Sequence, residues 1–448
     1  MNQQRTWQEI IFLAAPVVIS KLSFTIMGLV DIAMVGKLGA TEQGGVGIAT
    51  TFLITIYVLG LGMITVVNSF VSQYRGAQKP DLCGQVLNNA LFLAVIIGFF
   101  NMAFLIASEP LFLLSGLSEG VSKASYDYIF FRALGTPAVF IYFSYNSYIE
   151  GVGKTQITMK ISLIANIVNI IGDYIFIFGW GIIPPMGVKG AAIATALSNT
   201  FILLCLMWTV HKPGSYFKEF GNRYIFKPLQ WTMIKKLITV GSPVGMQYFM
   251  QHSAVLLCNI FVGQVGDIDL AASQVTMRIM SISFMTAWGI SIATTTLVGK
   301  YQGMGNQRKA YYIGLHANAL ALIFTVFCST LFMLIPEVFV QVFSSSKKII
   351  KLASILLRIA AFFQIFDSIS LVSSGALKGA GDTMWPFKTN SAINWFIGVP
   401  LVYIFTIKAE LGAIGMWLGM LAMIIFQAIA MFLRFRHGPW KKIKIIEI

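Results

Sequence analysis

Apolar stretches long enough to cross a membrane follow one another from Ile10 to Leu433, with short polar breaks between them. A helix that spans the hydrocarbon core needs about 20 mostly apolar residues. The pattern predicts an all-α integral membrane protein. We expect twelve transmembrane helices, at approximately residues 10–35, 46–74, 86–107, 124–150, 156–178, 190–210, 237–262, 269–299, 310–333, 352–377, 385–407 and 411–433.

Composition supports a chain that lies mostly in lipid. Hydrophobic residues make up 57% of the chain and charged residues only 11%, against roughly a quarter for a soluble domain. The net charge of +15 falls mainly in alternate loops, as the positive-inside rule describes. No basic stripe is interleaved with stacking aromatics, so a nucleic-acid partner is not expected. The distribution predicts a multi-pass protein of the cell (inner) membrane with both termini in the cytoplasm.

An internal repeat divides the chain into two halves. Pro16 matches Pro243 and Gly62 matches Gly289, both at an offset of 227 residues, and the segment 150–155 matches 378–383 at an offset of 228. The basic segment 211–236 lies between the halves. We therefore expect an N-lobe at 1–210, a cytoplasmic linker at 211–236 and a C-lobe at 237–448. Two parallel six-helix lobes indicate a transporter that exposes a central site alternately to each side.

Polar side chains in the first half suggest a cation site. A carboxylate at membrane depth is a functional candidate because its insertion is unfavourable. Asp31 lies in the first predicted span, and Asn166, Asn169 and Asp173 share one face of the fifth span at spacings of three and seven residues. Thr195 in the sixth span adds a hydroxyl oxygen. Carboxylate and amide oxygens suit a hard cation or a proton. The alternatives are a helix-end carboxylate at Asp31 and a hydrogen-bonded packing seam at Asp173.

The second half carries a further set of polar residues. Gln247 and Gln251 lie one helical turn apart in the seventh span, and Asp367 lies in the tenth. They could line a substrate pathway or join helices through hydrogen bonds. Asp367 has a structural alternative as the ion-pair partner of Arg278 in the eighth span.

These residues resemble the multidrug and toxic compound extrusion (MATE) family, within a superfamily that also contains flippases for lipid-linked oligosaccharides. The resemblance covers nearly the whole chain. It rests on Pro16 followed by Asp31, on the segment Val35-Gly36-Lys37-Leu38-Gly39, and on the repeated motifs at 150–155 and 377–383.

The resemblance implies two six-helix bundles that form a V around a central cavity, and export of amphipathic or cationic small molecules in exchange for Na⁺ or H⁺. It implies a coupling site at Asp31, Asn169, Asp173 and Thr195, of which the first three are possible ligands of Na⁺. It also implies a bending point at Pro16. The related second-lobe site would have a glutamate where this chain has Gln251, although Asp367 is kept.

Two other functions stay open at this stage. A flippase for a lipid-linked saccharide should have a cationic cavity for a pyrophosphate, but Lys21, Arg132, Arg278 and Arg358 are few and dispersed. A membrane-embedded transferase should gather loop carboxylates around a metal, and the sequence has none paired in this way. We therefore expect a transporter and no enzyme, working as a monomer without a cofactor beyond the coupling ion.

Overall fold

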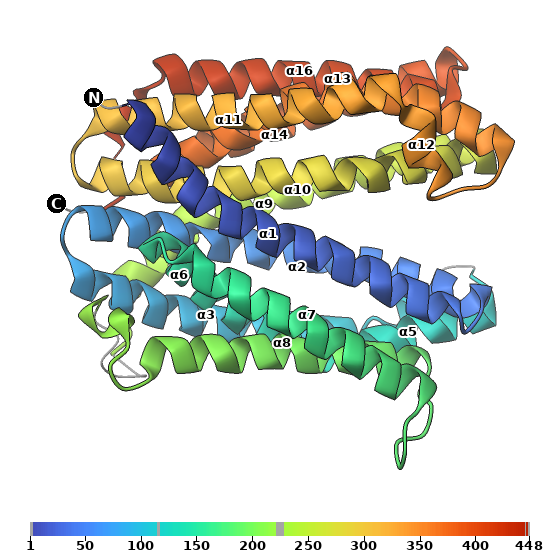
Figure 1. The fold of residues 1–448 in the computed structure, drawn as a ribbon, viewed down its shortest axis with the longest axis horizontal. Helices are drawn as coiled ribbons and strands as arrows, with labels where there is room; N and C mark the ends of the chain where they lie inside the picture. The colour runs from blue at the N-terminus through green and yellow to red at the C-terminus, as the bar shows by residue number, and fades with distance from the viewer. Residues whose placement is uncertain (1–2, 114–116, 221–227, 444, 447–448) are drawn as a thin grey trace. The chain divides into compact units, whose positions relative to one another are not determined.

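The computed structural model describes residues 3–113, 117–220, 228–443 and 445–446 (Figure 1). Within them the regular secondary structure is helical, apart from one isolated β-bridge between Trp180 and Ile183. The first half contains α1 (Gln3–Gly36), α2 (Ala40–Gly76), α3 (Pro80–Ile106), α4 (Glu109–Leu113), α5 (Glu119–Leu134), α6 (Thr136–Val152), α7 (Thr155–Phe178) and α8 (Val188–His211). The second half contains α9 (Trp231–Val265), α10 (Asp267–Gly303), α11 (Gln307–Leu334), α12 (Pro336–Gln341), α13 (Lys347–Ala380), α14 (Met384–Ala392), α15 (Val399–Tyr403) and α16 (Gly412–His437).

All twelve predicted spans lie on helix. Within the described ranges, ten helices are long and apolar enough to cross a membrane. The predicted seventh span lies on α9, and the predicted fourth span is divided into α5 and α6 at Gly135, just before Pro137. Proline removes a backbone donor and clashes with the preceding turn, which accounts for the break. The all-α membrane class is confirmed.

The predicted eleventh span contains an irregularity. It combines α14 and α15 with two π-helical segments, Ile393–Gly398 and Ile404–Lys408. Pro400 lies between these segments, at the start of α15. A π-helical turn shifts the backbone hydrogen bonds by one residue, and the proline adds a missing donor. Hydropathy does not reveal such a shift, because it leaves the apolar composition unchanged.

The repeated glycine motif forms the same turn in both halves. α6 ends at Gly153 and α13 ends at Gly381, and both glycines have positive φ, 80° and 92°. The amide of Gly153 donates to the Glu150 carbonyl at 2.8 Å, and that of Gly381 donates to the Lys378 carbonyl at 3.0 Å. A left-handed residue at a helix C-terminus is accessible to glycine at little cost. The motif is therefore a helix cap, which explains its repetition.

The chain forms two compact units that divide inside helices. One unit comprises residues 1–18 and 246–448, and the other comprises residues 19–245. The divisions fall two residues after Pro16 in α1 and two residues after Pro243 in α9. The predicted lobes at 1–210 and 237–448 follow whole helices, so they differ from these units. The centre of the predicted linker, residues 221–227, lies outside the described residues.

Close backbone approaches hold the first part of each divided helix in its unit. In α9, a Cβ at Gly245 would lie 2.2 Å from the Leu59 carbonyl oxygen of α2, and one at Gly241 would lie 2.6 Å from that of Met63. In α10, a Cβ at Gly289 would lie 2.6 Å from the Val18 side chain of α1. Only glycine permits these distances.

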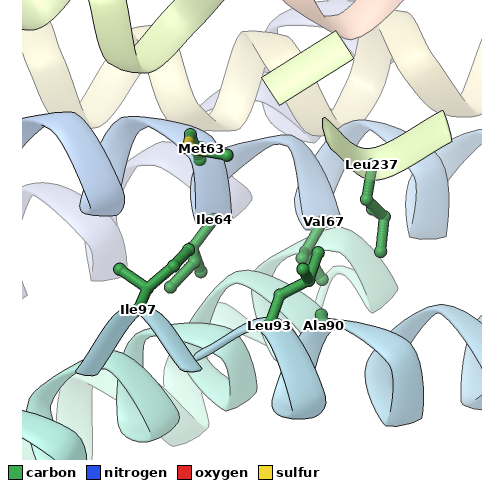
Figure 2. A pocket seen from close by; sticks show the side chains of 7 residues that line it. All are labelled: Met63, Ile64, Val67, Ala90, Leu93, Ile97 and Leu237. Atoms are coloured by element: carbon green, nitrogen blue, oxygen red, sulfur yellow. The ribbon is translucent and has the colours of Figure 1, made fainter. Parts of the chain in front are cut away.

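A small cavity lies beside the first part of α9. Figure 2 shows Leu237 of α9 facing Val67 of α2 and Leu93 of α3 across it. The other lining side chains, Met63, Ile64, Ala90 and Ile97, are also apolar. The cavity therefore offers no polar group for a ligand and belongs to the packing of α9 on α2 and α3.

Candidate functional site

The polar residues of α7 are buried on the side of the helix that packs inside its unit. Asn169 and Asp173 are fully buried, and Asn166 is 9% exposed. The opposite side carries exposed apolar side chains such as Ile167 and Ile171. A membrane helix with this distribution places its apolar side toward lipid and its polar side toward the protein. The spacing of the three residues predicted this shared face.

A second helix brings Asp31 to the same place. Asp31 comes from the part of α1 that belongs to unit 19–245. Its carboxyl group and that of Asp173 lie within hydrogen-bonding reach of each other. An ionised carboxylate can only accept a hydrogen bond, so two of them at this separation repel each other unless a proton or a cation lies between them. The structure thus brings together two carboxyl groups that are far apart in the sequence.

Thr195 lies on α8, which packs closely against α7. A Cβ at Gly190 of α8 would lie 2.2 Å from the Phe176 carbonyl oxygen, and one at Gly172 would lie 3.3 Å from Ala194. Asp173 follows Gly172 in the sequence and Thr195 follows Ala194. The Thr195 side chain is 4% exposed. Its hydroxyl donates to the Ala191 carbonyl oxygen at 2.9 Å, which leaves its lone pairs able to accept or to bind a cation.

Apart from Thr195, each polar side chain of the site has buried atoms that receive no hydrogen bond from a protein donor. Both oxygens of Asp173, one oxygen of Asp31, both polar side-chain atoms of Asn169 and the amide oxygen of Asn166 are buried without one. Buried polar atoms are usually satisfied, and unsatisfied ones are costly. A seam that only joins helices would use these atoms in hydrogen bonds between helices. Carboxylate and amide oxygens that converge without partners instead suit a hard cation or a proton.

One residue of this region was not recognised as part of it from the sequence. Arg132, near the end of α5, interacts electrostatically with both Asp31 and Asp173. It also interacts with Tyr57, Tyr128 and Tyr142. The signal was present, because Arg132 is a cation inside a predicted span, but no spacing rule connects α5 with α1 and α7.

The second-half candidates lie in the other unit and do not form an equivalent carboxyl pair. Asp367 of α13 is 7% exposed, and Gln247 of α9 is buried with its amide oxygen unpartnered. Gln251 is partly buried. Arg278 is exposed, and among the described residues it forms no ion pair with Asp367. The structure therefore does not bring these two side chains together, in contrast to the suggested ion pair.

The described residues contain no group of three His, Cys, Asp or Glu side chains that could hold a metal ion. The Asp31 region has two carboxyl groups with amide and hydroxyl oxygens around them. Such a set lacks the nitrogen and sulfur ligands that zinc prefers. Oxygen donors of this kind suit a hard cation or a proton.

Comparison with known proteins identifies the family. The family model MatE matches residues 16–175 and again residues 243–404, so the two matches begin 227 residues apart, the offset of the internal repeat. The chain is 29% identical to the probable multidrug resistance protein NorM of Thermotoga maritima, over 97% of this chain and 93% of that protein. It is 28% identical to the multidrug resistance protein MdtK of Pectobacterium atrosepticum, over 95% and 94% of the two chains.

Solved structures share the fold. A crystal structure of a MATE protein in the straight conformation matches with a TM-score of 0.89 at 23% identity, over 98% of this chain and 97% of the other. The eukaryotic MATE transporter AtDTX14 matches with a TM-score of 0.88 at 16% identity, over 98% and 97%. Together with the family model, which covers both halves of the sequence, these matches confirm the resemblance. The chain belongs to the MatE family of multi-pass membrane transporters and is a transporter rather than an enzyme.

Proposed function

We propose that this protein is a secondary active multidrug exporter that exchanges amphipathic or cationic small molecules for Na⁺ or H⁺ by alternating access. The observation that carries the proposal is the pair of carboxyl groups at Asp31 and Asp173, which lie within hydrogen-bonding reach of each other and have buried oxygens without a protein donor. Relatives named multidrug resistance proteins support the class of substrate. The protein acts as a monomer in the cell (inner) membrane, with both termini in the cytoplasm.

The coupling follows from the charge of the site. When Asp31 and Asp173 are both ionised, the pair attracts a cation, and binding of Na⁺ or H⁺ offsets the repulsion between them. A cation that binds one orientation of the transporter more tightly than the other shifts the population toward that orientation. Coupling between cation and substrate is then reciprocal. Asn169 and Thr195 supply neutral oxygens that stabilise the bound cation.

The flippase alternative receives less support from the charges. It needs a cationic cavity, but Lys21 and Arg132, the candidate cations for it in unit 19–245, each have acidic neighbours. Arg132 lies near Asp31 and Asp173, and Lys21 interacts electrostatically with Glu150. These carboxyl groups oppose the positive charge that a pyrophosphate would require. Drug export is therefore the better proposal.

Reconstitution tests the proposal and identifies the ion. The purified protein is reconstituted into proteoliposomes that contain ethidium. Movement of ethidium across the membrane is followed under a Na⁺ gradient alone and under a pH gradient alone. We expect one of the two gradients to drive ethidium against its concentration difference, and an ionophore that dissipates that gradient to stop it. Transport that neither gradient accelerates would contradict ion-coupled export.

A further inference from the structure

Arg132 is a charged residue of the candidate site that the proposed coupling does not involve. Its Nε atom is buried and has no hydrogen-bond partner. Two carboxyl groups interact electrostatically with Arg132. Their atoms Oδ1 of Asp31 and both oxygens of Asp173 also have no hydrogen-bond partner. The guanidinium and the two carboxyl groups attract each other electrostatically, yet no hydrogen bond joins them. An unsatisfied donor and unsatisfied acceptors therefore belong to groups of opposite charge that interact within one unit.

The groups around the guanidinium form a second environment for it. Its Cζ atom lies 6.0 Å from the centre of the Tyr128 ring, a distance at which a cation–π contact operates. Tyr57 and Tyr142 are the other aromatic neighbours, and the Tyr57 hydroxyl is held by Thr136 at 2.6 Å. All three tyrosines are at least nine-tenths buried. We call Tyr57, Tyr128 and Tyr142 the tyrosine cluster.

Counting charges shows what Arg132 changes. Two ionised carboxylates give a buried charge of −2, and the guanidinium, which stays protonated in proteins, reduces it to −1. One monovalent cation then neutralises the site. Without the arginine, one cation would leave a net negative charge in a region of low dielectric, where electrostatic attraction to further cations is strong.

We propose that Arg132 is an internal counter-ion that replaces the coupling cation at the Asp31–Asp173 pair. In the cation-free state the guanidinium moves to the carboxylates, and when the cation enters it returns to the tyrosine cluster. Arg132 thus competes with the cation, promotes its release, and limits the site to one monovalent cation in each cycle. This inference rests on the proposed function of the carboxyl pair and adds a residue that positions charge at it.

Removal of the competing charge should strengthen cation binding. Arg132→Gln keeps polarity and much of the chain length but loses the charge. We expect the concentration of Na⁺ or H⁺ that half-saturates transport to fall at least about tenfold, since a unit charge at short range in a partly dry site changes affinity by this much or more. We also expect slower turnover, because the cation leaves more slowly. Arg132→Lys keeps the charge and should restore the wild-type half-saturating concentration.

The experiment uses the whole protein in two formats. Ethidium transport in proteoliposomes is measured over a range of Na⁺ concentrations at fixed pH, and over a range of pH without Na⁺. In detergent, the same cation series is followed by thermal unfolding, which requires no transport. If Arg132→Gln does not accumulate in the membrane, Arg132→Met replaces it, with Arg132→Lys as the control in either case.

The outcomes separate this inference from the proposed function. Cation affinity that is unchanged or weaker in Arg132→Gln, or equally altered in Arg132→Lys, would overturn the counter-ion role even if Asp31→Asn and Asp173→Asn lose coupled transport. Normal coupled transport in both aspartate variants would instead refute the proposed function itself. A lower half-saturating cation concentration in Arg132→Gln, with the wild-type value in Arg132→Lys, supports the counter-ion role.

Discussion

Asp367 is a buried carboxyl group, and no second carboxyl group among the described residues interacts with it. Arg278 is exposed and does not pair with it among the described residues. We therefore expect Asp367→Asn to fold normally, because an amide keeps the shape and removes a buried charge. Its effect on ethidium efflux should be partial, since the Asp31–Asp173 pair is intact. Complete loss of gradient-driven efflux at normal membrane abundance would assign the coupling to α13 instead.

Gln251 replaces a carboxylate by an amide at the position where the resemblance places a glutamate. An amide is a weaker cation ligand than a carboxylate. Gln251→Ala should therefore change the relative efflux rates of different organic cations while ion coupling persists, as measured by transport of several dyes under one gradient. Loss of transport of every dye, with normal membrane abundance, would show that the coupling site was assigned to the wrong unit.

At the scale of single residues, the sequence identifies candidates by type and depth but does not give their neighbours. A carboxylate inside an apolar run is visible in the sequence, which is how Asp31, Asp173 and Asp367 were found. The spacing of Asn166, Asn169 and Asp173 also predicts their common face. The proximity of Asp31 to Asp173 and of Arg132 to both depends on the packing of α1, α5 and α7, which hydropathy does not encode.

At the scale of elements, the contact between α9 and α2 depends on Gly245. A Cβ there would lie 2.2 Å from the Leu59 carbonyl oxygen, and backbone atoms cannot yield as a flexible side chain does. Gly245→Ala should therefore lower stability by about 1–3 kcal/mol and reduce the thermal unfolding temperature in detergent. Gly47→Ala in α2 is the matched control, because a Cβ at Gly47 would have no neighbour within 4 Å. Equal unfolding temperatures for the two variants would contradict the close contact.

The existence of the helices could be predicted, whereas their interruptions could not. A run of about 20 apolar residues has few alternatives to a helix in lipid, because every backbone polar group must be satisfied internally. The break between α5 and α6 follows from Gly135 and Pro137, which the hydropathy pattern passes over. The π-helical segments near Pro400 depend on how that helix is packed.

At the scale of the whole molecule, the internal repeat predicts two similar halves but not the division within α1 and α9. Similar sequences in the two halves predict similar helices. They do not indicate to which compact unit each part of a helix belongs. In the structure, residues 1–18 belong with 246–448, and Glu9 of α1 forms ion pairs with Lys300 and Lys309 at 3.3 and 3.4 Å. Such contacts between distant segments cannot be derived from the repeat.

The twelve-span topology makes a prediction about sidedness. The even number of spans and the basic loops place Lys236 in the cytoplasm. A reporter enzyme that is active only in the cytoplasm should therefore be active when it is fused after Lys236. A reporter inserted near Ser118, between the third and fourth predicted spans, should lie on the opposite side. Paired reporters, one active only in the cytoplasm and one only outside, test each position. The same sidedness at both positions would refute the twelve-span arrangement.

The central claim is that Asp31 and Asp173 together form the coupling site, and one measurement tests it most directly. Gradient-driven ethidium transport is compared in proteoliposomes that contain Asp31→Asn, Asp173→Asn or both substitutions, at equal amounts of inserted protein. Asparagine is nearly isosteric but cannot ionise, and loss of a buried charge relieves desolvation. We predict normal insertion and no coupled transport in each single variant, with the double variant no worse because the two groups act as one site. Near-normal coupled transport in both single variants would contradict the account.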